Sequence, residues 1–337
     1  RHSTRRQRQM CIRDSVYPEG GNLVAGLPNR VYFEAFTPAK KPADLAGVVV
    51  DSEGRRLAEF RSEHEGRGRF EFTPGKGQKC SMKITEPSGI KTLFPLPDVK
   101  NEGAVIRTDR DVFRPGEPVK LHVGCTSSDG RLKVVLSERE VGVAAALVDP
   151  ADTDASGLVP VKLTPPDKAD GVLVATVWDS AGKPLAERLV FRRPAESIQV
   201  KITADADRYV PGGKASLTIE TTDGSGQPTG AVVGLTVTDD SVLEMIEKRE
   251  QAPRLPVMVL LENDVSELAD AHVYLDPEDQ EAPLAVDLLL GTQGWRRFAF
   301  IETTRFIKEH GDLARRALAL RMVSRRDWRR FSNERLR

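Results

Sequence analysis

The 337-residue sequence has only three cysteines, no long apolar run and no net charge. Cys80 and Cys125 fall in different predicted domains, so a disulfide framework is not expected and both are predicted to be small buried side chains. No stretch approaches 18 continuous apolar residues, which argues against a transmembrane helix. Residues 16–300 carry an excess of ten acidic groups, which argues against nucleic-acid binding.

Patterns that carry catalysis or metal binding are also missing. No two of the five histidines have metal-ligand spacing, and His64 is predicted to lie in an exposed turn. Asp239-Asp240 is predicted to end a strand, because a calcium loop needs several spaced oxygen ligands. There is no Gly-x-Ser-x-Gly, no P-loop and no Gly-x-Gly-x-x-Gly after a strand. We therefore expect no catalytic residues, no metal and no cofactor.

The two ends of the chain differ from its body. Residues 1–15, "RHSTRRQRQMCIRDS", have no hydrophobic period and resemble translated sequencing-adapter read-through; a disordered arm is the alternative. Residues 301–337 carry eleven basic and five acidic groups and are predicted to form a basic helical tail. Because the sequence starts with Arg1, it is expected to be an internal fragment.

A phrase of the body occurs twice. Residues 109–119 read "DRDVFRPGEPV" and residues 207–217 read "DRYVPGGKASL", which places Pro115-Gly116 and Pro211-Gly212 at equivalent positions, 96 residues apart. Proline fixes φ and glycine tolerates positive φ, so each Pro-Gly pair predicts a turn. Alternating apolar residues follow each turn and predict a strand with one buried face. A repeat of this length is that of a small β-sandwich.

The predicted fold is all-β: tandem immunoglobulin-like β-sandwiches followed by a partly helical, irregular C-terminal region. Hairpin turns are expected at 51–54, 74–77 and 180–183, and strands near 119–123, 131–136, 158–163, 171–178 and 185–191. Further strands are expected in 198–202, 215–221 and 231–245, and short helices in 262–275 and 283–295. The predicted divisions are an N-terminal arm 1–15, sandwiches 16–99, 100–193 and 194–300, the last with an insertion, and the tail 301–337.

Five phrases, taken in order, resemble the bacterial branch of the alpha-2-macroglobulin family. They are "YPEGGNLVAGLPNRVYFEA" at 17–35, "HEGRGRFEFTPGKG" at 64–77, "DRDVFRPGEPVKL" at 109–121, "DRYVPGGKASLTIETTDGSGQPTGAVVGLTVTDDSVLEM" at 207–245 and "DLLLGTQGWRRF" at 287–298. The resemblance covers residues 17–298. It implies that the sandwiches are macroglobulin-like domains, and that the protein is a noncatalytic, extracytoplasmic inhibitor that traps proteases after they cut an exposed bait segment. The Cys-Gly-Glu-Gln thioester of such proteins is absent from these 337 residues, since the cysteines stand in "CSMK" and "CTSS"; a thioester farther downstream and a protein without one are the two alternatives.

The resemblance puts the bait at about 246–262, "IEKREQAPRLPVMVLLE". Basic candidates for cleavage are Lys248, Arg249 and Arg254, and apolar candidates are Leu255, Met258 and Leu260. Pro253 and Pro256 disfavour regular structure there. The alternative is an ordinary interdomain connector, because "VMVLL" has the pattern of a buried segment. For the whole chain, the rivals to protease inhibition are a structural or adhesive surface scaffold and an enzyme whose catalytic domain lies elsewhere.

Overall fold

The computed structural model describes residues 16–126, 130–138, 141–210, 212–237, 254–262, 265, 268, 271–276, 278–293 and 311–312. The chain divides into two compact units, Arg1–Trp295 and Arg296–Arg337, and every element named below belongs to the first. The predicted arm 1–15, the Asp239-Asp240 pair and nearly all of the predicted tail 301–337 lie outside the described residues.

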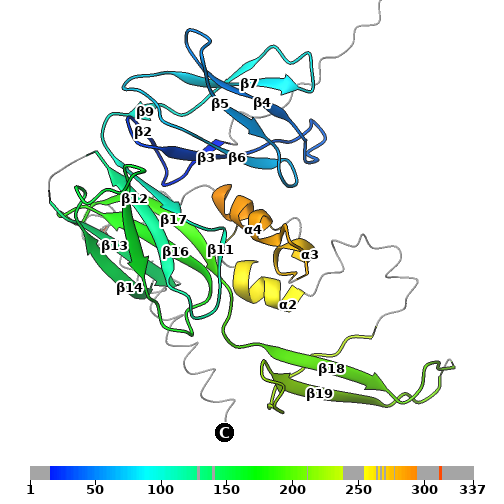
Figure 1. Ribbon diagram of the computed structural model, residues 1–337. Helices are drawn as coiled ribbons and strands as arrows, with labels where there is room; N and C mark the ends of the chain where they lie inside the picture. Colours follow the sequence, from blue (N-terminus) through cyan, green and yellow to red (C-terminus); the bar gives the residue numbers. More distant parts are fainter. Residues whose placement is uncertain are drawn as a thin grey trace, which may run out of the picture. The chain divides into compact units, whose positions relative to one another are not determined.

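The first sandwich consists of two antiparallel sheets (Figure 1). One holds β1 (Val16–Pro18), β3 (Asn29–Glu34) and β6 (Arg67–Phe72), and the other holds β5 (Arg56–Arg61), β4 (Ala46–Asp51), β7 (Cys80–Glu86) and β8 (Leu93–Pro95). A short parallel pair, β2 (Leu23–Val24) with β9 (Val99–Lys100), lies beside them. Phe33, Phe60 and Phe70 meet in the core with ring centroids 5.4–6.4 Å apart.

The hairpin between β4 and β5 confirms the turn predicted at 51–54. Gly54 has φ +80°, a left-handed conformation that glycine adopts without steric cost. The Asp51 carboxylate accepts hydrogen bonds from the backbone N–H of Glu53 at 3.0 Å and of Arg55 at 2.9 Å. These local bonds give the turn its shape independently of the core below it.

The second sandwich pairs a three-stranded with a five-stranded sheet. The first is β10 (Ala104–Thr108), β12 (Val119–Cys125) and β15 (Val159–Leu163). The second, in order, is β11 (Val112–Phe113), β17 (Pro184–Arg192), β16 (Gly171–Trp178), β13 (Leu132–Glu138) and β14 (Val141–Val148). The predicted strands of this region are confirmed. The alanine-rich β14 was not predicted; it is an edge strand whose residues are half-buried or exposed.

Strands β16 and β17 are buried on both faces, which breaks the usual alternation of buried and exposed residues. Leu173, Ala175 and Val190 point into the sandwich core. Val172 and Phe191, on the opposite face, pack in a separate apolar cluster with residues of the helical region. The stretch "GVLVATVW", apolar except for the buried Thr176, follows from this double burial.

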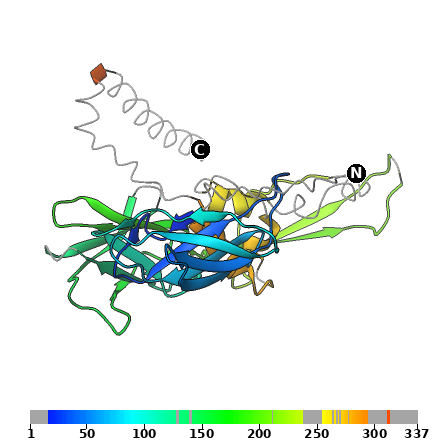
Figure 2. The ribbon, with the colours of Figure 1, turned by 90° about the horizontal axis from the view of Figure 1, so that it is seen from above.

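In the predicted third sandwich, the described residues hold one two-stranded sheet, β18 (Ile198–Ala204) with β19 (Leu217–Asp223). Figure 2 shows the two strands as a long ribbon. Residues 231–237, predicted as part of a strand, belong to no strand. The predicted boundary at 193/194 lies just after β17, and the one at 99/100 lies inside β9. The third sandwich and the exact domain boundaries remain predictions.

The helical region begins at residue 254. It contains α2 (Arg254–Val257), the π-helical turn η2 (Met258–Glu262), α3 (Ala271–Tyr274) and α4 (Ala282–Gly291). Helix α4 confirms the helix predicted from Pro283 to Gly291, with proline in its first turn. Its last turn is closed by Thr292, whose backbone N–H donates to the Leu288 carbonyl at 3.1 Å. Because eight of its ten residues are buried, α4 is an internal helix.

Candidate functional site

The structure separates the predicted bait residues into two groups. Lys248 and Arg249 lie outside the described residues. Arg254, Leu255 and Met258 belong to a regular helical backbone, since α2 and η2 together span 254–262. The expectation that Pro256 would keep this stretch irregular is therefore wrong from Arg254 onward. Pro256 falls in the first turn of α2, where a missing backbone N–H costs no hydrogen bond.

This helical segment, Arg254–Glu262, is docked on the second sandwich; we call it the docked segment. Val257 and Leu261, four residues apart and so on one helical face, are 4% and 0% exposed. Val259 is 50% exposed and marks the outer face. Leu261 packs in the apolar cluster that contains Val172 and Phe191 of the sandwich. The buried appearance of "VMVLL" is thus explained by packing against β16 and β17.

The same apolar cluster contains α4, through Ala285, Val286, Leu289 and Leu290. In Figure 1, α4 and α2 lie beside β17 and β11. The docked segment and α4 therefore share one hydrophobic contact surface on the second sandwich. The end of the predicted bait is in this way connected by direct packing to a buried helix.

Helix α4 carries one charged residue, Asp287, and its side chain is 1% exposed. The carboxylate accepts a hydrogen bond from the Tyr32 hydroxyl of β3 at 2.8 Å and pairs with Arg69 Nη1 of β6 at 2.5 Å. Its other oxygen pairs with Arg188 of β17. One buried carboxylate on a helix therefore bonds to donors from both sandwiches.

Further ion pairs extend from this point. Arg69 also pairs with Asp111 at 2.5 Å, and Arg188 also pairs with the buried Glu19. Glu71 accepts from Arg30 at 2.9 Å and pairs with Arg107 of the second sandwich. We call the connected set the junction network; its charged members are Glu19, Arg30, Arg69, Glu71, Arg107, Asp111, Arg188 and Asp287. With four acidic and four basic members it is balanced, as buried charge must be.

Burial and neighbouring charges shift the pKa values of three residues in this network. It raises the pKa of Tyr32, and the charge of Asp287 raises it further, so the hydroxyl keeps the proton that it donates. Burial lowers the pKa of Arg188, while Asp287 opposes that change. Burial also acts to lower the pKa of Arg69, but the nearby Asp111 and Asp287 outweigh it and leave that pKa raised. The arrangement favours fixed charges that hold position, in contrast to a proton-transfer site.

Two more contacts attach the helical region to the first sandwich. Arg67 of β6 pairs with Glu34 at 3.2 Å and donates to the Tyr274 hydroxyl of α3 at 3.3 Å. Gly291, at the end of α4, lies directly against Tyr32, where an added Cβ would be 2.2 Å from the ring. Glycine is required at 291 because two elements approach this closely.

The junction network was missed in the sequence, although it leaves a signal there. Asp287 is the only charged residue in the otherwise apolar "PLAVDLLLG", and Arg188 interrupts a buried strand. A lone charge inside an apolar element is unfavourable unless it is paired. The pattern shows that a partner is needed, but it does not show which residue supplies it.

Other predicted features have plain structural roles. Cys80 is buried and Cys125 half-buried, and no disulfide joins these two described residues. His64 opens a tight turn, as predicted, but it is half-buried with its ring 6.3 Å from that of Tyr274, so the predicted exposure is wrong. Among the described residues, no group of three His, Cys, Asp or Glu side chains could hold a metal ion. No helix in the described ranges is long and apolar enough to cross a membrane.

The fold and the junction network define a tandem β-sandwich protein whose sandwiches are joined through one internal helix. Residues 104–245 match the family model of the alpha-2-macroglobulin bait region domain. These residues are thus similar to the bait region domain of the alpha-2-macroglobulin family, and the predicted resemblance is confirmed over this part of the chain. The match covers the second sandwich and the β18–β19 hairpin and ends at Met245, directly before the predicted bait segment.

Solved structures give more distant similarities. Native E. coli alpha-2-macroglobulin is 12% identical, with 63% of this chain and 17% of that chain covered and a TM-score of 0.20. Salmonella alpha-2-macroglobulin reacted with methylamine is also 12% identical, with 64% and 18% covered and a TM-score of 0.20. Domains 4–9 of the surface layer protein SbsC are 13% identical, with 65% and 38% covered and a TM-score of 0.31. The chain spans less than two thirds of the length of each. No curated protein matches the sequence.

Proposed function

We propose that this chain is the bait-bearing part of a protease inhibitor of the alpha-2-macroglobulin type. The observation that carries the proposal is the match of residues 104–245 to the bait region domain. Residues 246–262 follow that match directly and contain the basic residues Lys248, Arg249 and Arg254. The chain acts without catalysis of its own. Its partners are proteases, which it meets outside the cytoplasm, and nucleic acid is not a partner.

The order of elements along the chain supplies a mechanism. Both sandwiches and the hairpin precede residue 246, whereas the docked segment and α4 follow it. Cleavage at Lys248 or Arg249 removes the covalent connection between these two parts. The helical region is then held by noncovalent contacts, among them its apolar cluster, the Arg67–Tyr274 hydrogen bond and the junction network. The contact between the helical region and the sandwiches can then dissociate. Without the covalent link, each part has a lower effective concentration near the other.

Release or rearrangement of the helical region alters the contact between the sandwiches. Asp287 bonds to Tyr32 and Arg69 of the first sandwich and to Arg188 of the second. When it moves, the two arginines lose the carboxylate between them. A bait cut is expected to act through such a change in packing, which is how a local event becomes a global one.

Limited proteolysis of the 337-residue chain tests this function. Trypsin at low concentration should make its first cut after Lys248, Arg249 or Arg254, which mass spectrometry locates. The cut protein should then change its radius of gyration in small-angle scattering or its migration in native gels. A matched variant with all three residues changed to Gln (K248Q/R249Q/R254Q) should resist that cut and keep its dimensions under the same treatment.

Two outcomes would overturn the proposal. First cuts elsewhere would remove the bait assignment and leave 246–262 as an interdomain connector. A first cut at the expected site without a change in dimensions would favour the structural-scaffold alternative, in which the junction network simply holds the sandwiches together.

A further inference from the structure

We propose that the free edge of strand β14 is an interaction surface, and that it pairs with β14 of a second copy of this chain. Strand β14 (Val141–Val148) is the last strand of the five-stranded sheet in the second sandwich. Among the described strands it pairs only with β13, so no strand lies along its other edge. The inference goes beyond the bait function and does not depend on it.

The composition of β14 distinguishes it from the other edge strands. Natural proteins protect sheet edges with charged residues, proline or very short strands, because an open edge can pair with another chain. Strand β14, "VGVAAALV", has eight residues and neither a charge nor a proline. Every other described edge strand longer than two residues contains one or the other: Pro18 in β1, Arg56 in β5, Arg67 in β6, Pro95 in β8, Arg107 in β10, Lys162 in β15, Lys201 in β18 and Glu220 in β19.

The edge is regular over most of its length. The pairing of β14 with β13 shifts register near Gly142, and beyond that shift the five residues Ala144–Val148 pair without interruption. The opposite edge of the same sheet is β11, which has only two residues and lies beside α4 (Figure 1). A further strand therefore fits this sheet at β14, whereas β11 is too short to pair with one.

The side chains of β14 define the kind of strand that fits beside it. On the face toward the core, Ala144, Ala146 and Val148 are partly buried against the apolar cluster of the second sandwich. On the opposite face, Ala145 is exposed and Leu147 is 66% exposed. An added strand has apolar neighbours on both of its faces, and apolar cross-strand pairs stabilise a sheet. The matching partner is thus an uncharged strand that is apolar on both faces.

A second copy of β14 has these properties. Strand β16, "GVLVATVW", is also uncharged, but among the described strands it already has β13 and β17 on its two sides. Every register of an antiparallel β14–β14 pair places uncharged residues opposite each other, so the paired strands do not repel each other. Such a pair has twofold symmetry and uses both free edges, so it joins two five-stranded sheets into one and forms a closed dimer.

The oligomeric state of the 337-residue chain tests this inference. Sedimentation equilibrium over a wide range of protein concentration should show a reversible equilibrium between monomer and dimer. The dimer should be a weak one, because a contact through one strand edge is small. Hydrogen exchange of the β14 amides should slow as the concentration rises, while exchange of the β4 amides in the first sandwich should not change.

Two matched variants locate the contact. Leu147→Lys places a charge on β14, and an edge lysine is a usual block to strand pairing. Leu93→Lys makes the same change at a residue that is 51% exposed on β8, an edge strand of the first sandwich. Leu147→Lys should raise the dissociation constant of the dimer by about fivefold or more, because each dimer then has two added charges at one seam. Leu93→Lys should change it by less than about twofold.

A peptide provides a measurement that needs no variant. A synthetic peptide with the β14 sequence and one lysine at each end, added in excess, should bind the chain and convert the dimer to a monomer–peptide complex. A peptide with the same residues in scrambled order, interrupted by a proline, should not do so, because proline cannot donate to the strand ladder.

Four results would overturn the inference. A chain that stays monomeric at every concentration does not make this contact. A dimer that responds equally to Leu147→Lys and Leu93→Lys forms through another surface. A monomer that still binds the β14 peptide has an edge for a strand of a different protein. Growth beyond the dimer shows open-ended pairing in place of a closed twofold pair. None of these results affects the proposed bait function, whose test is proteolysis.

Discussion

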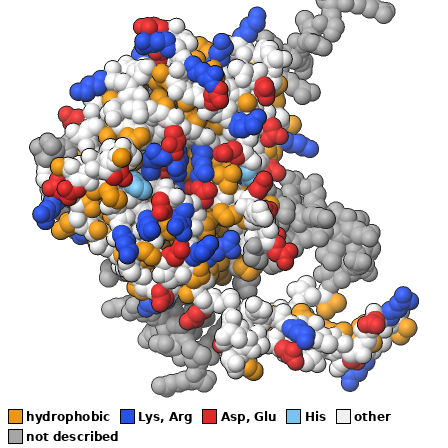
Figure 3. Space-filling model, viewed as in Figure 1, with side chains coloured by type: hydrophobic (Ala, Val, Ile, Leu, Met, Phe, Trp, Pro, Cys, Tyr) orange, Lys and Arg blue, Asp and Glu red, His pale blue; other side chains and the backbone are white. Residues whose placement is uncertain are grey.

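Strands β12 and β19 follow the two copies of one sequence phrase, and they lie in different surroundings. Gly116 and Gly212 have nearly the same backbone conformation, with φ +72° and +76°. Beyond the turn, Leu121 of β12 is 0% exposed, whereas its counterpart Leu217 of β19 is 39% exposed. Figure 3 shows hydrophobic side chains at the surface of the β18–β19 hairpin. The repeated phrase therefore gives the same turn in both copies, but the strand that follows the turn is buried in only one of them.

The difference separates what is local from what is not. A Pro-Gly turn depends on the φ preferences of two residues, so both copies form it. Burial of the next strand depends on a second sheet, which the second sandwich supplies through β13, β16 and β17. Among the described residues, β19 pairs only with β18. The aromatic position before each turn agrees with this: Phe113 is 1% exposed, and its counterpart Tyr209 is 42% exposed.

The largest expected effect comes from comparing a buried with an exposed ion pair. Asp287→Asn keeps the shape of the side chain but leaves Arg69 and Arg188 without their shared negative charge. Removing one partner of a buried pair costs about 3–5 kcal/mol, which should appear as a lower denaturant midpoint. On the hairpin, Glu220→Gln removes a pair with Lys201 whose side chains are 60% and 75% exposed, and it should change the midpoint little. Equal midpoints for the two variants would show that Asp287 does not hold the sandwiches together.

The next comparison tests burial at equivalent positions of the repeat. Leu121→Ala should lower the free energy of unfolding by about 2–5 kcal/mol, because it leaves a cavity in the core of the second sandwich. Leu217→Ala, at an exposed position, should change it by about 0.5 kcal/mol or less. Chemical denaturation followed by circular dichroism measures both. A large loss for Leu217→Ala would mean that the hairpin is covered in solution by something beyond the described residues.

A third comparison tests whether the two turns are alike. Gly116→Val and Gly212→Val each force a β-branched residue into positive φ, at a cost of about 1–3 kcal/mol. Gly116→Val should lower the melting temperature of the second sandwich. Gly212→Val should instead speed hydrogen exchange of the β18 and β19 amides, because its effect stays in the hairpin. If either substitution is silent in its own assay, that glycine does not hold the turn.

The difference between local and distant interactions also explains which elements could be predicted from the sequence. Apolar runs, which alternate with polar residues in β12, predicted β12, β13, β15, β16 and β17, and proline and glycine predicted both ends of α4. Such patterns act within one element, where a period of two or of 3.6 residues determines which side is buried. They could not predict that "RLPVMVLLE" forms a docked helical segment, because its partners are Val172 and Phe191, some 60 to 90 residues earlier.

The junction network lies beyond sequence patterns for the same reason. Asp287 meets Tyr32, Arg69 and Arg188, which are separated from it by 255, 218 and 99 residues. No rule based on residue spacing relates positions that are so far apart in the sequence. The two signals that were present, a lone Asp in an apolar helix and the charged Arg188 at a buried position of a strand, indicate a need for pairing without identifying the partner.

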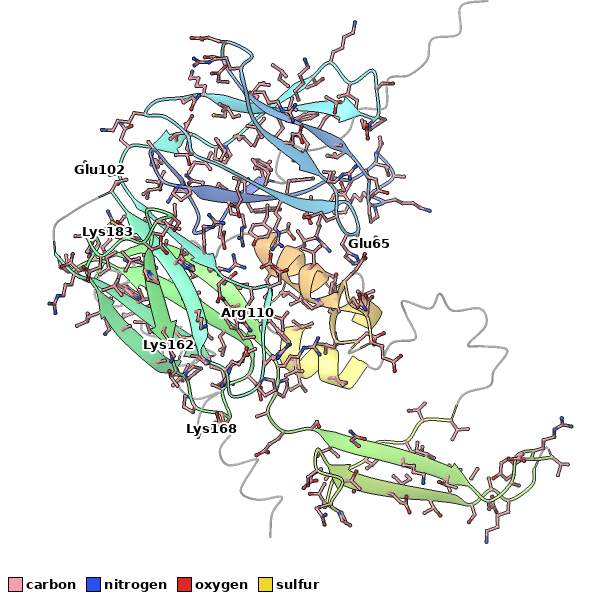
Figure 4. The ribbon with its side chains drawn as sticks, in the orientation of Figure 1. Glu65, Glu102, Arg110, Lys162, Lys168 and Lys183 are labelled. Carbon is pink, nitrogen blue, oxygen red and sulfur yellow. The ribbon has the colours of Figure 1, made fainter. Side chains whose placement is uncertain are left out.

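The smallest effect concerns a carboxylate that only the first phrase contains. The backbone N–H of Arg114, at 3.1 Å, lowers the pKa of Glu117, and the charge of Arg110, at 2.9 Å, lowers it further. Figure 4 labels Arg110, which belongs to the loop between β10 and β11. The counterpart of Glu117 in the second phrase is Gly213, which cannot make this interaction. An NMR titration of the Glu117 carboxyl should therefore give a midpoint below the ordinary value of about 4.3.

The sign of the pH dependence follows from that direction. Because the pKa of Glu117 is lower in the folded protein than in the unfolded chain, its contribution to stability is present above the unfolded value and is lost as the pH falls through the folded value. Arg110→Gln should raise the midpoint only in part, because the Arg114 N–H still donates. Glu117→Gln should leave the protein less sensitive to acid in this range, while Gly213→Ala in the second phrase should not alter the acid response. A Glu117 midpoint that Arg110→Gln restores fully to the ordinary value would show that the charge, and not the turn backbone, lowers this pKa.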